Sequence, residues 1–313
     1  MPEVKILITD GLEKNGQAIL GAAALVDDRT GISADDLLQI VSEYDALIIR
    51  GRTQVTRDVF GAASRLKVVG RSGVGVDNID LAAASGHHVV VVNSPHATTL
   101  AVAEHALALM LALARFIPRA DASMKSGQWI KNELNGVELY GKTLGVIGMG
   151  NIGSTVAQRA AALGMSVQAY DPLVSPEEIS RRGARPVSLA ELYAFSDFIS
   201  LHIPINSETR GLIGGQALAQ MKRGVRLIST ARGGIIDETA LLGALESGQV
   251  AGAALDVFAH EPTGISALAS HPNVVATPHI AAQTVEAQAR AAADVAQEVL
   301  AALSGAPLRW KVV

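Results

Sequence analysis

Three short segments in the last third of the chain carry side chains suited to moving a proton beside a bound carboxylate. The segments are residues 229–234, 255–262 and 277–280, and each lies at the end of a predicted strand. His279 in the third segment has an imidazole, which titrates near neutral pH and can both accept and return a proton. Arg232 in the first segment has a planar, permanently charged guanidinium that matches a carboxylate. Taken singly, each residue is also compatible with an ordinary surface charge or a satisfied polar group.

A glycine-rich segment in the middle of the chain has the pattern of a dinucleotide-binding loop. It reads LGVIGMGNIG, with G-x-G-x-x-G at Gly148, Gly150 and Gly153 between an apolar strand and an amphipathic helix. In that context the glycines permit a tight turn, close approach of the backbone to a pyrophosphate, and packing of the helix on the strand. We expect the free amides of Asn151 and Ile152 at the start of the helix to face the phosphates.

An acidic residue at the end of the next strand indicates which dinucleotide binds. Asp171 follows the strand predicted at residues 166–170. Its carboxylate can accept hydrogen bonds from the ribose hydroxyls and would repel a 2′-phosphate. The sequence therefore predicts NAD rather than NADP as the cofactor, although an Asp in an ordinary turn at a strand end is the alternative.

Two series of alternating strands and helices must position these groups. Such alternation predicts parallel sheets covered by helices on both faces. The first series has predicted strands at residues 5–9, 24–26, 46–49, 66–69 and 89–92. The second follows an apolar helix at about 99–116 and a polar connection, with strands at 143–147, 166–170, 198–202, 226–229 and 252–257.

Capping signals indicate where several helices begin. Ser33 can cap the free amides of a helix in the first series. The four-residue runs that begin at Ser175 and Ser188 both end in Glu and have the pattern of a capping box, with Pro176 at the first helical position. The last long helix, residues 284–303, has no following strand of its own, so we expect it to return to the first series.

The predicted fold is α/β, with two doubly wound parallel-sheet domains. Residues 1–95 and 285–313 would form a flavodoxin-like substrate domain, and residues 96–284 an inserted Rossmann domain that binds the cofactor. A chain of 313 residues is long enough for two domains of about 100 to 200 residues each.

Together these motifs resemble the D-2-hydroxyacid dehydrogenase family. The resemblance also rests on RSGVGVDNID at residues 71–80, and it covers nearly the whole chain with the motifs in the family's order. It implies an NAD-dependent enzyme that passes a hydride between nicotinamide and C2 of a small 2-hydroxy acid. The family's regulatory C-terminal extensions do not follow Trp310 here, so we expect no feedback through such a domain.

The resemblance assigns three catalytic roles. His279 resembles the histidine that takes the alcohol proton as hydride leaves C2 and returns it in the reverse reaction. Glu261 resembles the carboxylate that fixes the tautomer of that histidine and stabilises the imidazolium. Arg232 resembles the arginine that grips the substrate carboxylate and polarises the C2 oxygen.

The resemblance also assigns binding roles. The backbone amides of Val74 and Gly75 match those that bind the substrate carboxylate. Asp256 is expected to accept a hydrogen bond from the nicotinamide carboxamide. The other positions that resemble cofactor contacts are Ile203, Thr230, Ala231 and Ala282.

Two arginines at strand ends of the first domain bear on the identity of the hydroxy acid. Arg50 and Arg71 are expected where the cleft between the domains opens, and two guanidiniums there can hold a dianion. They resemble positions near the distal phosphate in the family members that oxidise D-3-phosphoglycerate, with Arg52 a third candidate of weaker match. The resemblance to those members implies oxidation of D-3-phosphoglycerate to 3-phosphohydroxypyruvate, at the entry to serine synthesis.

Several departures from those members leave the substrate open. Val74 stands where they often have Thr, Ser72 where they often have Ala, and Ala281-Ala-Gln283 replaces a Gly-Ala-Ser stretch. A lost hydroxyl and a larger amide could reshape the distal pocket. The alternatives are a hydroxypyruvate or glyoxylate reductase and a 3-sulfolactate dehydrogenase, since a sulfonate would be held by the same arginines. The direction of the reaction also stays open.

Two rival classes share the expected architecture. A non-catalytic, NAD-sensing corepressor is disfavoured because His279, Glu261 and Arg232 are all present. A formate-type dehydrogenase is disfavoured because its substrate needs no acid-base pair.

Composition excludes several partners. The formal net charge is −4 with no dense basic run, so we expect no nucleic acid partner. The absence of cysteine removes disulfides and cysteine-type zinc sites, and no ligand spacing for another metal is evident. The N-terminus lacks a secretion signal, and we expect a cytoplasmic protein.

The apolar stretch at residues 100–113 is the one segment that raises a membrane interpretation. Glu104 and His105 interrupt it, and it falls short of the roughly 20 apolar residues needed to span a bilayer. We expect a buried or interface helix instead. The family uses the corresponding segment in a two-fold interface, which implies a homodimer, with a tetramer left open.

Overall fold

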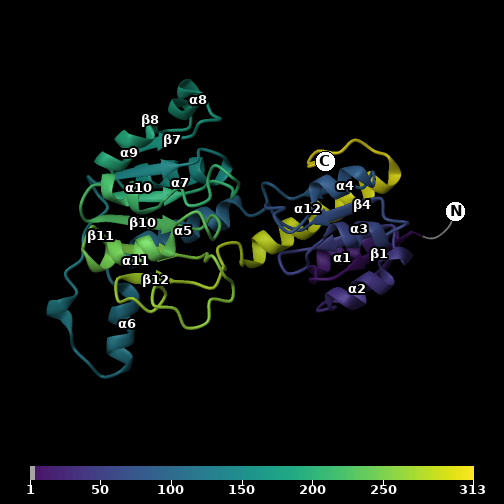
Figure 1. Cartoon of the computed structure of the whole chain (residues 1–313), viewed down its shortest axis with the longest axis horizontal. Coiled ribbons are helices and arrows are strands. Elements are labelled where there is room, and N and C mark those ends of the chain that lie inside the picture. The colour runs from purple at the N-terminus through teal and green to yellow at the C-terminus, as the bar shows by residue number, and fades with distance from the viewer. Residues whose placement is uncertain (1–3) are drawn as a thin grey trace. The chain divides into compact units, whose positions relative to one another are not determined.

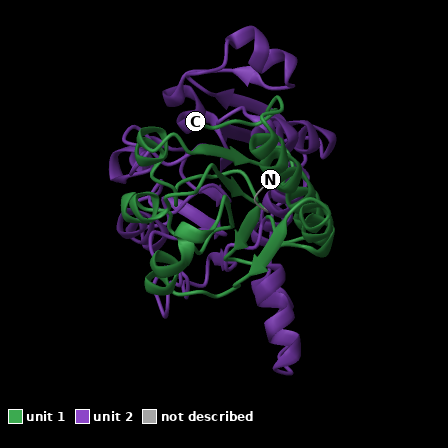
Figure 2. Ribbon diagram, turned by 90° about the vertical axis from the view of Figure 1, so that its right-hand side faces the viewer, with its two compact units in different colours: residues 1–98, 282–313 green, residues 99–281 purple. Residues whose placement is uncertain are grey.

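The computed structural model describes residues 4–313, which form two compact units. Unit 1 consists of the chain up to Thr98 together with Ala282–Val313, and unit 2 consists of Thr99–Ala281 (Figure 2). Each unit is built on one parallel sheet with helices packed against it (Figure 1). The predicted α/β class with two doubly wound sheets is therefore confirmed.

Unit 1 has a five-stranded sheet in the order β2-β1-β3-β4-β5, with every pair parallel. This is the flavodoxin-like order. The strands are β1 (Lys5–Ile8), β2 (Leu25–Asp28), β3 (Ala46–Ile49), β4 (Val68–Arg71) and β5 (Val90–Asn93). The helices are α1 (Lys14–Gly21), α2 (Ala34–Ile40), α3 (Arg57–Ala62), α4 (Leu81–Gly86) and α12 (Val285–Ser304), with a short 3-10 turn η1 (Val41–Glu43).

Alternate residues of the unit 1 strands face two separate hydrophobic clusters. Ile8 packs in the cluster that includes Val295 of α12, whereas Leu7 packs in the cluster that includes Leu37 of α2. Gly70 of β4 lets α12 approach closely, because a Cβ there would lie 2.5 Å from a methyl carbon of Val299. The sheet is thus covered on both faces, as its continuous apolar strands predict.

Unit 2 has a seven-stranded sheet in the order β12-β11-β10-β9-β6-β7-β8. The strand order reverses between β6 and β9, which is where doubly wound sheets bind ligands. The strands are β6 (Thr143–Ile147), β7 (Ser166–Tyr170), β8 (Arg185–Pro186), β9 (Phe198–Leu201), β10 (Val225–Ser229), β11 (Val250–Leu255) and β12 (Val274–Ala276).

The helices of unit 2 cover both faces of this sheet. Met110 of α5 and Val156 of α7 belong to one hydrophobic cluster, and Leu192 of α9 and Leu241 of α11 belong to the other. The helices are α5 (Thr99–Ala114), α6 (Ile117–Lys125), α7 (Asn151–Ala162), α8 (Pro176–Arg181), α9 (Leu189–Phe195), α10 (Gly215–Gln220) and α11 (Glu238–Glu246), with a 3-10 turn η2 (Lys131–Glu133).

The predicted caps differ in outcome. Ser33 accepts a hydrogen bond from the amide of Asp36, and Ser188 forms the complete capping box, so both predictions are confirmed. Ser175 also caps its helix, but the reciprocal half of the box is wrong. The carboxylate of Glu178 instead bonds the guanidinium groups of two arginines one turn further on.

Some element boundaries also needed correction. The apolar helix ends at Ala114 rather than Phe116, because Phe116 adopts a left-handed backbone with φ of 53°. The connection predicted after it contains α6, which projects from the rest of unit 2 (Figure 1). The strand predicted at 66–69 is observed at Val68–Arg71, since Leu66 closes a turn after α3 by donating to the carbonyl of Ala63.

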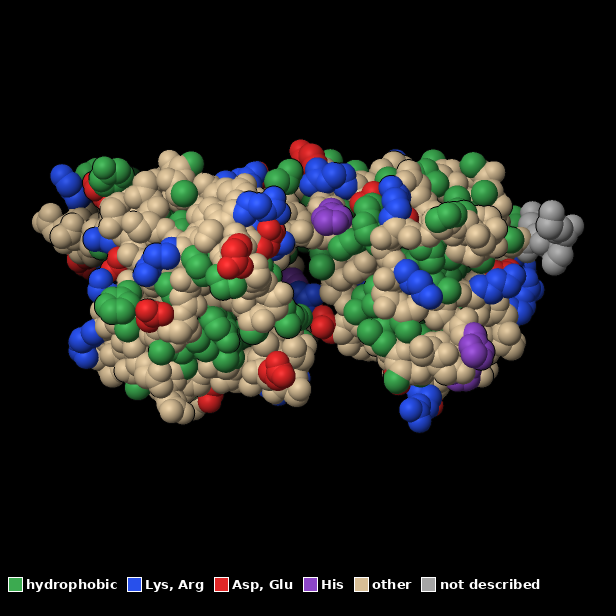
Figure 3. All heavy atoms as spheres, turned by 90° about the horizontal axis from the view of Figure 1, so that it is seen from above, with side chains coloured by type: hydrophobic (Ala, Val, Ile, Leu, Met, Phe, Trp, Pro, Cys, Tyr) green, Lys and Arg blue, Asp and Glu red, His purple; other side chains and the backbone are tan. Residues whose placement is uncertain are grey.

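Among residues 4–313, no single helix is long and apolar enough to cross a membrane. The pair α5 and α6 passes that test only together, and the two helices are bent by 65° at their junction. On the face shown in Figure 3, basic and acidic side chains are interspersed without a continuous band of either sign.

Candidate functional site

The candidate catalytic groups of unit 2 lie at one edge of its sheet. Strands β10, β11 and β12 are adjacent and parallel, so their carboxyl ends meet at that edge. Arg232 lies on the loop after β10, Asp256 directly follows β11, and His279 follows β12. Ligands of doubly wound sheets bind beyond the carboxyl ends of the strands.

His279 and Glu261 form a hydrogen-bonded pair. Nδ1 of His279 lies 2.7 Å from Oε2 of Glu261. The other carboxylate oxygen, Oε1, accepts from the amide of Phe258 at 2.9 Å, which fixes the orientation of Glu261. A ring that donates from Nδ1 to a carboxylate has Nε2 as its proton acceptor. The pair can therefore take a proton from a hydroxyl at Nε2 and stabilise the resulting imidazolium.

The backbone at His279 is held in an uncommon conformation. Its φ is 54°, in the left-handed region that residues other than glycine seldom adopt. The amide of His279 donates to the carbonyl of Asp256 at 2.9 Å. The next two amides, of Ile280 and Ala281, each donate to the Asp256 carboxylate at 2.9 Å. Asp256 therefore anchors the loop that presents the imidazole.

Asp256 is fully buried, and its carboxylate is surrounded by donors. Thr277 Oγ1 donates to Oδ1 at 2.6 Å, and His105 Nε2 lies 3.4 Å from the same oxygen. Burial alone would raise the pKa of Asp256, but hydrogen bonds from His105, Thr277, Ile280 and Ala281 outweigh it and hold the pKa below its usual range. The expected contact of Asp256 with the nicotinamide stays a prediction. In the structure its carboxylate also holds the loop that carries His279.

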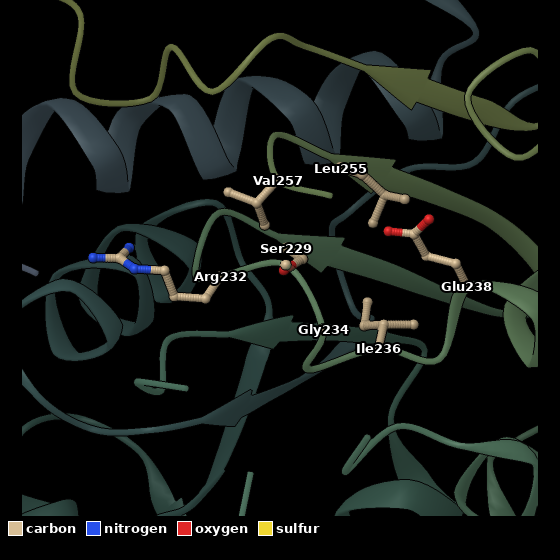
Figure 4. A pocket seen from close by; sticks show the side chains of 8 residues that line it. Ser229, Arg232, Gly234, Ile236, Glu238, Leu255 and Val257 are labelled. Atoms are coloured by element: carbon tan, nitrogen blue, oxygen red, sulfur yellow. The ribbon is translucent and has the colours of Figure 1, made fainter. Parts of the chain in front are cut away.

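The loop that carries Arg232 packs directly on the loop that carries Glu261. A Cβ on Gly233 would lie 1.8 Å from the carbonyl oxygen of Phe258, so only glycine fits there. Arg232 donates from Nη1 to the carbonyl of Ala231 at 2.7 Å, and its side chain extends away from the small pocket drawn in Figure 4. The backbone contact thus links the candidate carboxylate-binding and acid-base segments.

Ala231 and Thr230 are both predicted cofactor contacts on this loop, and the polar one of the two is Thr230. Its side chain is buried, and Oγ1 has no hydrogen-bond partner among residues 4–313. Ser229 shows the same feature at the end of β10. Buried hydroxyls in proteins are usually hydrogen-bonded, so these two positions are compatible with a polar ligand nearby.

The three glycines of the dinucleotide pattern have different surroundings. Gly148 has φ of 94°, and a Cβ there would lie 2.5 Å from the carbonyl oxygen of His202 and 2.8 Å from Ile203. A Cβ on Gly153 would lie 1.9 Å from the carbonyl oxygen of Gly148. A Cβ on Gly150 would meet nothing within 4 Å. Two glycines therefore serve the turn and helix packing, and the third leaves open space beside the backbone, which fits a pyrophosphate.

The start of α7 and Asp171 complete the predicted cofactor loop. Helix α7 begins at Asn151, and no side chain caps it at Gly150, so its N-terminal amides, including that of Ile152, are suited to binding a phosphate. Asp171 accepts from the amide of Met149 at 2.7 Å and from that of Leu173 at 2.9 Å. Each of its oxygens keeps a lone pair for a ribose hydroxyl.

In unit 1, Arg50 is held by neutral acceptors. Its Nη2 donates to Oε1 of Gln288 and, at 3.3 Å, to Oε1 of Gln283. Its amide donates to Oδ2 of Asp10 at 2.8 Å. Burial alone would raise the pKa of Asp10, but hydrogen bonds from Thr53 and the Arg50 amide, with the charge of Arg52, hold that pKa below its usual range. The guanidinium of Arg50 is thus oriented by amide oxygens, with no carboxylate paired to it among residues 4–313.

Arg52 is engaged differently. Its guanidinium donates to the carbonyls of Ile32 at 2.9 Å and Thr9 at 2.8 Å, and it lies 3.3 Å from Asp10. These contacts tie three loops of unit 1 together, and a role for Arg52 in substrate binding stays a prediction.

The remaining substrate candidates follow β4. Arg71 donates from Nη1 to the carbonyl of Ser72 at 3.1 Å. Within the part of the chain that the structure describes, the amides of Val74 and Gly75 donate to no protein acceptor, which is compatible with binding an anion. The carbonyl of Ala282 accepts from Gln288 Nε2 at 2.8 Å.

Two residues near the site were not singled out by the sequence. His105 is a partly buried polar residue in an apolar helix, so the sequence indicated that it needs a partner but not which residue that partner is. Glu238 could not have been singled out from the sequence, because an acidic residue in the first turn of a helix is common. Among residues 4–313, no group of three His, Cys, Asp or Glu side chains could hold a metal ion.

Comparison with known proteins agrees with this geometry. The family model for the D-isomer specific 2-hydroxyacid dehydrogenase, NAD binding domain, matches residues 107–281. The D-3-phosphoglycerate dehydrogenase of Synechocystis sp. is 50% identical over 308 residues, which are 98% of this chain and 56% of that protein. The crystal structure of a glyoxylate reductase from Paecilomyes thermophila is 32% identical with a TM-score of 0.92 and covers 100% of this chain and 99% of its own.

A further solved structure is a D-lactate dehydrogenase from Aquifex aeolicus in complex with NAD and lactic acid, which is 31% identical with a TM-score of 0.84 and covers 96% of each chain. The chain belongs to the D-isomer-specific 2-hydroxyacid dehydrogenase family, and unit 2 contains the NAD-binding domain of that family. It spans about half the length of the D-3-phosphoglycerate dehydrogenases that it matches, 56% of the one from Synechocystis and 58% of the one from Bacillus subtilis.

Proposed function

We propose that this chain catalyses the NAD-dependent oxidation of a D-2-hydroxy acid to the 2-oxo acid, and the reverse reduction. The observation that carries the proposal is the bond of 2.7 Å between His279 Nδ1 and Glu261 Oε2. It orients the imidazole, directs Nε2 outward as the proton acceptor, and stabilises the positive charge that the ring gains. Bound NAD supplies the hydride acceptor, and the residues of the chain move the proton.

The substrate carboxylate is the second group to be bound. Arg232 offers a permanently charged fork for it on the loop after β10. In unit 1, the amides of Val74 and Gly75 have no protein acceptor among residues 4–313 and are suited to the same anion. We assign carboxylate binding to these groups, together with polarisation of the C2 oxygen by Arg232.

Within this reaction class, D-3-phosphoglycerate is the proposed substrate. Arg50 is oriented by the amide oxygens of Gln283 and Gln288, which are neutral and leave its charge able to attract a phosphate. Arg71 lies on the adjacent strand β4. The similarity to the Synechocystis D-3-phosphoglycerate dehydrogenase supports the same substrate.

Initial rates across a panel of acids test the proposal. The purified chain is mixed with NAD and D-3-phosphoglycerate, 3-sulfolactate, D-glycerate, D-lactate or glycolate, and NADH absorbance is followed, with NADH and the 2-oxo acids for the reverse direction. L-Lactate and L-glycerate are the stereochemical controls. A marked preference for phosphoglycerate supports the assignment, and a preference for sulfolactate keeps the anion site but changes the substrate.

Other outcomes of this panel contradict parts of the proposal. A preference for an acid without a distal anion refutes the roles of Arg50 and Arg71 but leaves the dehydrogenase intact. No turnover in either direction, with NADH still bound, contradicts the proposed dehydrogenase and favours a protein that senses NAD without turnover.

We further propose that the chain forms a homodimer through α5 and α6. Leu111, Ile117 and Met124 on these helices are 42%, 54% and 58% exposed, and Trp129 just beyond them is 77% exposed. Large apolar side chains gathered on one segment mark an interface. Light scattering after size exclusion should give the mass of a dimer, and the double variant Ile117→Lys with Met124→Glu should give a monomer. A monomeric wild type contradicts the proposal.

A further inference from the structure

Glu238 lies in the first turn of α11, but its carboxylate bonds a different loop. Oε1 of Glu238 accepts from the amide of Ala259 at 2.6 Å. Figure 4 shows the side chain turned toward Leu255 at the end of β11 rather than toward its own helix. Ala259 stands two residues before Glu261, so Glu238 holds the loop that carries the carboxylate of the acid-base pair.

The helix itself does not require Glu238 as a cap. Asp237 is the N-cap of α11, and its Oδ1 accepts from the amides of Thr239 and Ala240 at 3.0 Å each. An acidic side chain in a first turn commonly serves to satisfy such amides and the helix dipole. Here that task is already performed by the neighbouring residue, which leaves the bond to Ala259 as the specific contact of Glu238.

The loop that Glu238 holds is tied at successive residues. Gly233 packs against the carbonyl of Phe258, whose amide donates to Oε1 of Glu261 at 2.9 Å. Ala259 donates to Glu238, and Glu261 Oε2 contacts His279 at 2.7 Å. Residues 259–262 are otherwise exposed, so few packing contacts fix this part of the loop. The hydrogen bond from Glu238 to Ala259 therefore restrains an exposed part of the loop that few other contacts fix.

We propose that Glu238 is a positioning residue for the acid-base pair, which holds the amide of Ala259 so that Glu261 stays bonded to His279. This inference rests on the proposed dehydrogenase function. Glu238 itself touches neither member of the pair, and its effect on turnover passes through the loop. Small displacements of a catalytic group are enough to lower a rate, about 100-fold for a shift of about 1 Å.

Three variants of the full chain test this inference. Glu238→Ala removes the acceptor for Ala259, and Glu238→Gln keeps an oxygen at the same place without the charge. Glu246→Ala is the matched control, because Glu246 is an exposed acid at the other end of the same helix. Each is assayed for kcat, for NADH binding by fluorescence, for thermal stability, and for the pH dependence of oxidation.

The expected result is specific to a positioning role. Glu238→Ala lowers kcat about tenfold or more while NADH affinity stays within about twofold. Its rate of oxidation rises at a lower pH than in wild type, because a loosened Glu261 stabilises the protonated imidazole less. Glu238→Gln restores most of kcat and the wild-type pH profile, and Glu246→Ala changes neither.

Two outcomes overturn the inference. If Glu238→Ala keeps the wild-type kcat and pH profile, the bond to Ala259 does not support the pair. If kcat, NADH binding and thermal stability all fall together without rescue by Gln, Glu238 serves only the fold.

A readout without turnover separates this inference from the proposed function. The titration of the His279 ring is followed by NMR, with His279→Gln used to assign its signal. A lower midpoint in Glu238→Ala supports the positioning role even if none of the acids is oxidised. An unchanged midpoint in an active enzyme refutes it.

Discussion

His279 in unit 2 is bonded to a carboxylate, whereas Arg50 in unit 1 is bonded to the amide oxygens of Gln283 and Gln288. A carboxylate beside an imidazole stabilises its protonated form, so the ring can gain and lose a proton during a reaction. Neutral oxygens orient a guanidinium without cancelling its charge, so the charge stays available to an anion. The partner therefore decides whether a basic side chain serves proton transfer or anion binding.

The two units nevertheless anchor these side chains by the same device. In each, an aspartate with a buried carboxylate lies within two residues of the end of a strand and accepts two backbone amides and a threonine hydroxyl. Asp256 accepts from the loop of His279, and Asp10 accepts from the loop of Arg50. Their pKa values are held below the usual range although burial opposes this. A similar buried aspartate thus positions an acid-base group in one unit and an anion-binding group in the other.

The largest effect is expected from His279→Ala. Removal of the proton acceptor should lower kcat by at least about 100-fold, because a positioned acid-base group contributes about that much or more. NADH binding, measured by fluorescence, should stay close to wild type. His260→Ala is the matched control, since His260 is exposed and adjacent to Glu261 in the chain. Near-normal turnover without the imidazole would remove His279 from the reaction.

The next effect concerns the charge of Arg50. Arg50→Gln should lower kcat/KM for D-3-phosphoglycerate about 10- to 100-fold, since a hydrogen bond to a charged group is worth about 1.5–3 kcal/mol. The rate with D-glycerate, which has no distal anion, should change little. Equal losses with both acids would mean that Arg50 supports the fold rather than the distal group.

A companion variant gives Arg50 the kind of partner that His279 has. Gln283→Glu places a carboxylate near the Arg50 guanidinium without altering the arginine. It should lower kcat/KM for phosphoglycerate several-fold, less than Arg50→Gln, because the charge is offset but not removed. An unchanged value would show that the neutrality of this partner does not matter.

The sequence was most informative where chemistry depends on residues close together in the chain. Gly148 and Gly153 of the dinucleotide loop lie in one turn, so their spacing alone predicted the packing that the structure shows. The two parallel sheets were predicted from the alternation of apolar strands with helices. The second half of the predicted capping box at Ser175 was wrong because Glu178 bonds two arginines instead. The local sequence pattern does not show which of several possible partners a carboxylate will bind.

Contacts between distant segments were not predictable in the same way. His105 meets Asp256 only after α5 packs beside the sheet, and Glu238 meets Ala259 only after two loops come together. Their sequence surroundings resemble an ordinary polar residue in an apolar helix and an ordinary acid in a first turn. Helix α6 was missed because only two residues, Arg115 and the left-handed Phe116, separate it from α5.

A smaller effect is expected at a third carboxylate, Asp171, which holds the amide of Met149 in the cofactor loop. Asp171→Ala should lower the preference for NAD over NADP about tenfold, since it removes both an acceptor for the ribose and the repulsion of a 2′-phosphate. Asp171→Asn keeps an acceptor oxygen, so its preference for NAD should lie between those of wild type and Asp171→Ala. The ratio of kcat/KM for the two cofactors is the measurement, and an unchanged ratio would show that the ribose is recognised elsewhere.

The smallest effect concerns His202 of unit 2, which contacts a hydroxyl rather than a carboxylate. Nε2 of His202 contacts Ser200 Oγ at 2.8 Å, and burial lowers the pKa of His202 from 6.5 to about 4. Between these values the unfolded chain binds the proton more readily, so the stability present above pH 6.5 is lost as the pH falls toward 4. His202→Gln should remove about 1–2 kcal/mol of that dependence, seen as a smaller fall in Tm between pH 7 and pH 5. If Tm falls equally in wild type and His202→Gln, the acid sensitivity belongs to other groups, and burial of His202 does not control the stability of the protein at low pH.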